Sequence, residues 1–205
     1  MSAPGRRVLV AGIGNVFLGD DGFGVEVVGR IDASALPSTV EVADYGIRGV
    51  HLVYELLDGR HDTLIMVDAV PLDGPPGTLA VLEVDPPTGP ASADPPTGPA
   101  SSDSPTGAVS TGPPTAAVSA PEPSPPPALD GHGMDPEAVL GLLHAIGGAI
   151  DRVLVVGCRP AVIEERMGLS EPVRAVVDDA VSLVTELACE EAAKPGRAER
   201  RPADA

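Results

Sequence analysis

Three uninterrupted apolar segments limit the folds open to this chain more than any other feature of its sequence. They lie within residues 7–11, 63–67 and 152–156 and consist almost entirely of Val, Leu, Ile, Met and Ala. A strand with one face in water alternates apolar and polar side chains, whereas continuous apolar runs are typical of strands covered on both faces. We therefore predict that these segments are interior strands of a sheet with helices on both sides.

Helical patterns separate the apolar segments. In the last third of the chain, for example, Val173, Val176, Val177 and Ala180 recur at helical spacing. We expect helices over residues 22–31, 49–57, 135–146 and from Ser170 onward, with further strands over residues 40–43 and 78–84. Because strands that alternate with helices form mostly parallel sheets, the sequence predicts an α/β fold. The expected architecture is a three-layer sandwich with a twisted sheet of about five strands.

One segment departs from this pattern. From Asp85 the chain reads DPPTGPASA, DPPTGPASS, DSPTGAVST and GPPTAAVSA, which is a decaying repeat. Pro, Gly, Ser, Thr and Ala dominate it, and it has no periodic apolar face whose burial would offset the entropy cost of ordering. We predict one domain over residues 1–189, interrupted by a disordered insert over residues 86–128 and followed by a disordered tail over residues 190–205.

The charge of the chain excludes several classes of partner. The formal net charge is −17, and Lys194 is the only lysine. Nucleic-acid binding needs clustered cations to neutralise phosphates, and an anionic membrane surface repels so acidic a protein. The two cysteines, Cys158 and Cys189, have neither metal-binding nor disulfide spacing. We therefore expect a cytoplasmic protein that binds neither nucleic acid nor membrane.

Polar residues follow successive predicted strands. Asp20 and Asp21 come after the first strand, Asp44 after the second and Asp68 after the third, while His132 comes after the fourth strand and the insert. The carboxyl ends of parallel strands meet at one edge of the sheet, where open α/β folds bind ligands. Taken singly, Asp44 or Asp68 is equally well explained as a turn cap. As a set, these residues predict a site at that edge.

The first loop has two competing interpretations, a phosphate-binding loop and a cation site. Gly12 and Gly14 begin the pattern G-x-G-x-x-G of a dinucleotide loop, but Phe17 occupies the place of its third glycine. Two carboxylates then stand at the helix start, where a pyrophosphate would bind. The loop therefore favours a cation, and Asn15 is expected to hold it by bonding backbone groups.

Two carboxylates and one imidazole suit a divalent metal of borderline character. Zinc, nickel, cobalt and iron all meet this description, and the residues do not choose among them. His144 offers a second imidazole near His132. We expect His144 to be structural, because it lies on the apolar side of a predicted helix.

A family resemblance joins these motifs. The chain contains GIGN, GDDGFG, DYGIRG, MVDAV, DGHGMD, GCRP and GLS in this order. The combination resembles the hydrogenase maturation protease family over nearly the whole chain outside the insert and the tail. Members of this family are endopeptidases that remove a C-terminal peptide from the large subunit of nickel–iron hydrogenases once nickel has been inserted. The resemblance implies the same mostly parallel fold and an aspartic-type endopeptidase activity.

Matched motif by motif, the resemblance implies roles for individual residues. Asp21, Asp68 and His132 are then both metal ligands and catalytic residues, and the metal is the nickel of the substrate precursor. Asp44 matches an acid that handles substrate, and Asp20 is a second candidate for substrate binding. The implied partner is the hydrogenase large-subunit precursor, and the implied state of the protein is a monomer.

Two alternatives remain open at this point. Either Asp20 or Asp44 can serve as general base, and the sequence does not separate them. The same loops would also suit a metal-sensing adaptor that binds the precursor without cleaving it.

Overall fold

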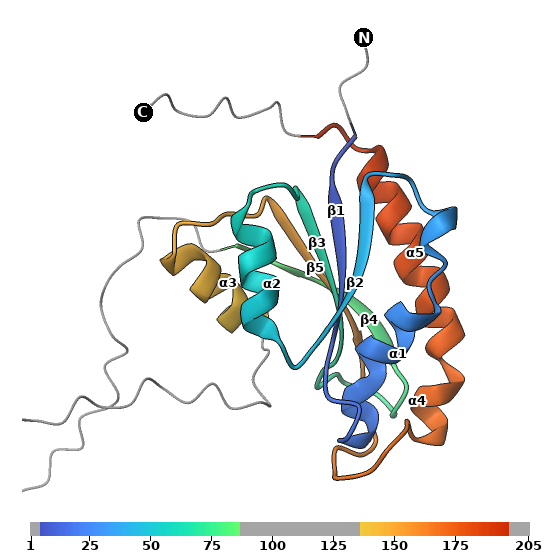
Figure 1. The fold of residues 1–205 in the computed structure, drawn as a ribbon. Helices are drawn as coiled ribbons and strands as arrows, with labels where there is room; N and C mark the ends of the chain where they lie inside the picture. Colours follow the sequence, from blue (N-terminus) through green and yellow to red (C-terminus); the bar gives the residue numbers. More distant parts are fainter. Residues whose placement is uncertain (1–4, 87–135, 197–205) are drawn as a thin grey trace, which may run out of the picture.

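The computed structural model describes residues 5–86 and 136–196 (Figure 1). These residues contain a five-stranded sheet with the order β2-β1-β3-β5-β4. β1 pairs in parallel with β2 and β3, and β3 pairs in parallel with β5, whereas β4 joins β5 in the antiparallel sense. The strands are β1 (Val8–Ile13), β2 (Val40–Gly46), β3 (Thr63–Ala69), β4 (Leu79–Val84) and β5 (Arg152–Cys158).

Helices cover both faces of the sheet (Figure 1). One face carries α1 (Phe23–Arg30), α4 (Glu171–Ala175) and α5 (Val177–Ala193), and the other carries α2 (Gly49–Leu57) and α3 (Pro136–Ala145). Two short 3-10 helices complete the fold, η1 (Gly19–Gly22) and η2 (Ala33–Ala35). Among the described helices, none is long and apolar enough to cross a lipid bilayer.

The apolar strands are buried on both sides, as predicted. Val8 and Val10 of β1 face the core that includes α1 and α5, while Leu9 and Ala11 face the core that includes α2 and α3. All four side chains have no solvent exposure. Because burial of one such side chain contributes roughly 1.5–3 kcal/mol, these two cores account for the layered architecture. The predicted three-layer α/β sandwich with a mostly parallel sheet is confirmed.

The last predicted helix is divided in two. Val176 separates α4 from α5 with φ −104° and ψ 3°, and its N–H bonds to the carbonyls of Val173 and Arg174. α5 then continues to Ala193, so residues 190–193 are helical and the predicted tail boundary at 190 is wrong. The physical reason is Glu191, which is 1% exposed and has three cations around it. Those cations are Arg6, Arg152 and Lys194.

Two of the predicted features lie largely outside the described residues. The insert predicted over residues 86–128 is described only at Pro86, and His132 is not described. α3 begins at Pro136, at the end of the helix nearest the carboxyl ends of β1 and β3 (Figure 1). β4 ends at the opposite edge, next to the amino end of β5.

Candidate active site

Backbone contacts shape the loop that follows β1. Gly14 has φ 121°, and a Cβ atom there would lie 1.8 Å from the carbonyl oxygen of Asp21. Only glycine allows this approach. The backbone N–H of Asn15 donates to Asp21 Oδ2 at 2.7 Å, and Asn15 Oδ1 accepts from the N–H of Phe17 at 3.0 Å. The expectation that Asn15 holds the loop through backbone groups is confirmed.

A second glycine brings the start of α1 against the sheet. A Cβ atom on Gly24 would lie 1.9 Å from the carbonyl oxygen of Val67 and 2.4 Å from that of Ile13. The helix backbone can therefore touch the carboxyl ends of β3 and β1 only because Gly24 has no side chain. This contact sets Asp21, just before α1, beside Asp68, the residue after Val67.

Asp68 occupies an electrostatically unfavourable place. Burial, with a smaller contribution from the negative charge of Asp21, raises the pKa of Asp68 to about 7, although a hydrogen bond from the Ala69 N–H acts to lower it. That N–H donates to Asp68 Oδ1 at 2.7 Å. Two carboxylates that repel each other in a partly desolvated place favour either a proton or a cation between them. The structure thus brings Asp21 and Asp68 together at the predicted edge.

Asp20, in contrast to Asp68, lies in surroundings that favour its charged form. It is fully buried and accepts hydrogen bonds from the backbone N–H groups of Ala161, Val162 and Ser170, at 2.8, 3.0 and 2.6 Å, and from the Ser170 hydroxyl at 2.8 Å. Burial alone would raise the pKa of Asp20, but these hydrogen bonds outweigh it and lower the pKa below its ordinary value. Asp20 therefore ties η1 to the segment between β5 and α4.

Asp44 lies at the end of the neighbouring strand. Its side chain is exposed, and in the β1–β2 ladder it stands opposite Gly12. The Arg48 guanidinium donates to the carbonyl oxygens of Asp44 and Tyr45, at 3.2 and 3.3 Å. These bonds fix the turn into α2. An accessible carboxylate thus stands on β2, the strand next to β1.

Comparisons with known proteins agree with this geometry. A sequence profile described as hydrogenase maturation protease matches residues 25–87. A protein of Methanocaldococcus jannaschii, whose name assigns it to the same proteases, is 42% identical over 80 residues, which are 39% of this chain and about half (52%) of that relative. The hydrogenase expression/formation protein HoxM of Azotobacter vinelandii is 30% identical over 206 residues, covering 98% of this chain and 82% of that relative. The chain belongs to the hydrogenase maturation protease family.

A solved structure supports the same assignment. The hydrogenase 2 maturation peptidase from Thaumarchaeota archaeon SCGC_AB-539-E09 superposes with a TM-score of 0.54 and 28% identity, over 89% of this chain and 97% of that chain. Membership of this family makes the chain a hydrolase of the peptidase class.

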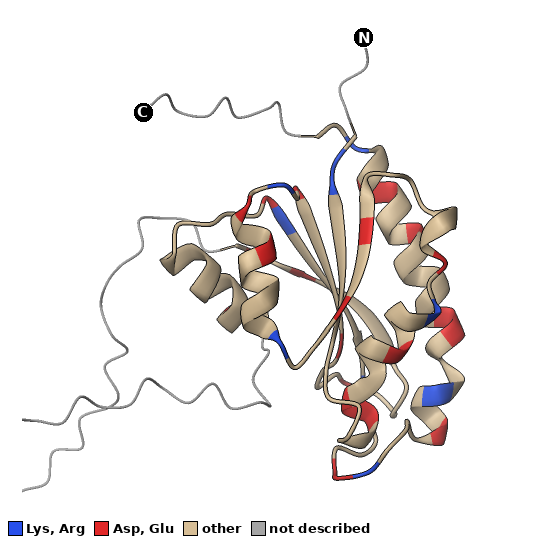
Figure 2. Cartoon of the chain, viewed as in Figure 1, with Lys and Arg blue, Asp and Glu red and all other residues tan. Residues whose placement is uncertain are grey.

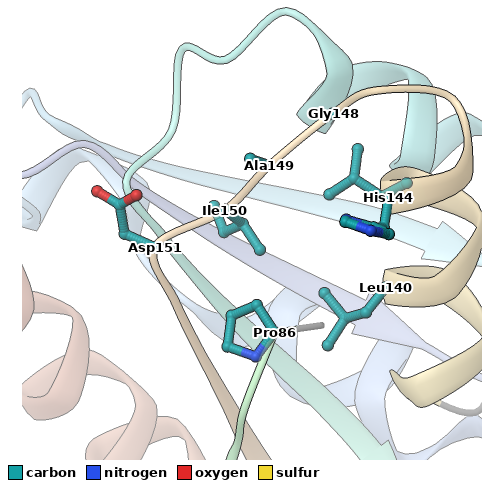
Figure 3. A pocket seen from close by; sticks show the side chains of 8 residues that line it. Pro86, Leu140, His144, Gly148, Ala149, Ile150 and Asp151 are labelled. Atoms are coloured by element: carbon teal, nitrogen blue, oxygen red, sulfur yellow. The ribbon is translucent and has the colours of Figure 1, made fainter. Parts of the chain in front are cut away.

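The second imidazole considered in the sequence lies far from the paired acids of this protease. His144, in α3, lines a cavity of about 450 Å³ together with Pro86, Leu140 and Ile150 (Figure 3). Neither Asp21 nor Asp68 lines this cavity. Because Ile150 and Asp151, which also lines the cavity, immediately precede β5, the cavity lies at the amino-end edge of the sheet, opposite the paired acids.

The structure also contains two arrangements that the sequence analysis did not identify. One is the bond between Asp20 and Ser170, which are far apart in sequence and share no motif. The other is a cluster of Glu41, Glu55 and His61, whose side-chain ligand atoms lie within 4.8 Å of one another. No spacing signal in the sequence points to either, because each depends on how α2 or the 159–170 segment folds back on the sheet.

Proposed function

We propose that this chain is an endopeptidase that removes a C-terminal peptide from the nickel-loaded large-subunit precursor of a nickel–iron hydrogenase. The observation that carries the proposal is the pairing of Asp21 and Asp68. Burial and the charge of Asp21 raise the pKa of Asp68 to about 7, so the pair is costly to ionise without a cation. A divalent metal presented by the precursor would remove that cost, which links recognition to the metal content of the substrate.

His132 is the proposed third ligand. In sequence it stands four positions before Pro136, the first residue of α3, and the family resemblance of the motif DGHGMD supports its role as a ligand. An imidazole with two carboxylates suits nickel and leaves positions open for the precursor's own groups.

The two candidates for the general base differ in this structure. Both oxygens of Asp20 accept hydrogen bonds inside the protein, which supports a positioning role for Asp20. Asp44 is exposed on the neighbouring strand, and we propose that it contacts the substrate or accepts a proton from the attacking water. The metal held by the precursor would polarise the scissile carbonyl as a Lewis acid.

An exposed apolar surface beside the acids supports docking of a protein substrate. Phe17 and Met167 are 63% and 74% exposed, and Ile163 is 53% exposed. The two loops that carry them are joined, because the Arg166 N–H donates to the Phe17 carbonyl at 3.0 Å. Exposed apolar residues of this kind, next to a site, mark a protein-binding surface. We propose that the precursor covers this apolar surface and that the acidic protein attracts basic residues near the cleavage site. We also propose that the protein acts in the cytoplasm as a monomer.

The test is cleavage of nickel-loaded precursor by Asp21→Asn, Asp68→Asn and His132→Ala, followed by mass spectrometry of the large subunit. Each variant is expected to lose processing, whereas Glu186→Gln, at an exposed acid on α5, is expected to retain it. Near-normal cleavage by all three variants would refute the proposed site. Stable binding of the precursor by the wild-type protein without truncation would favour the metal-sensing adaptor.

A further inference from the structure

A second group of metal-ligating side chains lies at the amino-end edge of the sheet. Glu41 is on β2, Glu55 is on α2, and His61 is in the connection between α2 and β3. Their ligand atoms lie within 4.8 Å of one another. Figure 2 shows acidic positions on both β2 and α2, and a basic position with acidic ones beside it on the connection that follows α2. The cluster is therefore separated from Asp21 and Asp68 by the length of the strands.

His61 is the residue that distinguishes this cluster from an ordinary surface group of acids. Its side chain is only 5% exposed, and its Nε2 lies 3.3 Å from Glu41 Oε2. Its Nδ1 is buried and has no hydrogen-bond partner among the described residues. His61 and Glu41 also line a small cavity of about 90 Å³. The hydrogen bonding of this buried ring is thus incomplete in the protein alone.

The surroundings of the cluster carry an excess of negative charge. Burial raises the pKa of Tyr45 to about 12, and the charges of Glu55 and Glu41 contribute to that rise, while Arg60 opposes it. Arg60 pairs with Glu55 and lies 3.5 Å from Asp58. Of the other charged groups, Arg7 lines the same cavity, and its backbone N–H bonds to Asp62 at 2.9 Å. The Arg60 guanidinium therefore neutralises part of the negative charge that a bound cation would meet.

We propose that Glu41, Glu55 and His61 form a second metal site, which takes a divalent first-row transition metal at the amino-end edge of the sheet. One imidazole and two carboxylates suit such metals, whereas Mg²⁺ and Ca²⁺ prefer oxygen ligands alone. Binding requires the Glu55 side chain to leave Arg60 and the three ligand atoms to move closer together. The metal then joins β2, α2 and the entry to β3, and it acts as a structural clip. This inference does not depend on the proposed peptidase function.

The test uses the full chain with the first site removed, as Asp21→Asn, Asp68→Asn and His132→Ala combined. Mn²⁺ is the probe, because it has little preference for the two thiols. Titration by calorimetry is expected to give one remaining site, and paramagnetic broadening of amide NMR signals is expected to centre on residues 41, 55 and 61. Adding Glu41→Gln and Glu55→Gln should weaken binding by roughly tenfold or more, whereas Glu186→Gln on exposed α5 should not.

A further variant separates a metal site from a mere ion-pair network. Arg60→Gln removes the cation that competes for Glu55, so Mn²⁺ should bind about two- to fivefold more tightly. Arg30→Gln, which breaks the distant pair with Glu26, is the matched control and should leave the affinity unchanged. Thermal melting in the presence of chelator establishes that the variants fold. Broadening centred elsewhere, no remaining binding, or unchanged affinity in Arg60→Gln would overturn the proposal.

Discussion

Replacing Asp68 by asparagine is expected to stabilise the metal-free protein above neutral pH. The pKa of this carboxyl is about 7 in the folded protein, against a reference value of 3.8. Between these values the folded state holds a proton that the unfolded state has lost. The wild-type protein therefore loses stability as pH rises through this window and has a constant deficit above it.

The size of the effect follows from the same two values. Their difference corresponds to a deficit of about 4 kcal/mol above pH 7 if the whole shift is expressed in stability. Asp68 is partly exposed, so water relaxes some of this cost. We therefore expect Asp68→Asn to be more stable than the wild type by about 2 kcal/mol at pH 8 and by less than half of that at pH 5. Asparagine keeps the shape of the side chain and cannot ionise.

Urea unfolding with chelator present, at several pH values from 5 to 8, measures this gain. Asp73→Asn, an exposed acid, is the control and should follow the wild-type pH dependence. Asp21→Asn should reduce the slope only in part, because burial contributes more than the Asp21 charge. If Asp68→Asn and wild type showed parallel pH dependences, the account of Asp68 as a desolvated, repelled carboxylate would be wrong.

Two further predictions concern the neighbours of this pair. Asp20→Ala leaves the N–H groups of Ala161, Val162 and Ser170 without their acceptor, so it should lower the free energy of unfolding by about 3 kcal/mol, against about 1 kcal/mol for Ser170→Ala. Urea unfolding at pH 7 measures both values. Equal losses would contradict the conclusion that Asp20 links η1 to the segment between β5 and α4. Phe17→Ser should weaken precursor binding about fivefold or more without shifting the melting temperature, as measured by calorimetry and thermal melting. Unchanged affinity would remove Phe17 from the docking surface.

The fold could be predicted well because the burial of a strand on both faces determines which residue types the strand contains. The apolar runs of β1, β3 and β5 have no polar alternation, and their covered position follows from that alone. The predicted start of the tail at residue 190 was wrong for a related reason. Residues after Glu190 have a polar composition, and the burial of Glu191 depends on cations contributed by the starts of β1 and β5.

The candidate site was only partly predictable. Its edge followed from the positions of Asp21, Asp44 and Asp68 after successive strands. The different roles of Asp20 and Asp21 could not be predicted, because the four hydrogen bonds that Asp20 accepts come from residues 141 to 150 positions away. Adjacent acids in a 3-10 turn point in different directions, and only the fold of the distant segment decides which one faces the interior.

The position of β4 also determines how much chain can be added after it. β4 is an edge strand that ends at the amino-end side of the sheet, while α3 starts at the other side. Crossing that height of about 20 Å takes roughly six extended residues, and the sequence provides 49 between Pro86 and Pro136. Closing even a fully flexible loop of this length costs only about 2 kcal/mol more than closing the shortest one. The same junction should therefore accept inserted reporter domains or shortened connections without disturbing the strand pairing that holds Asp21 beside Asp68.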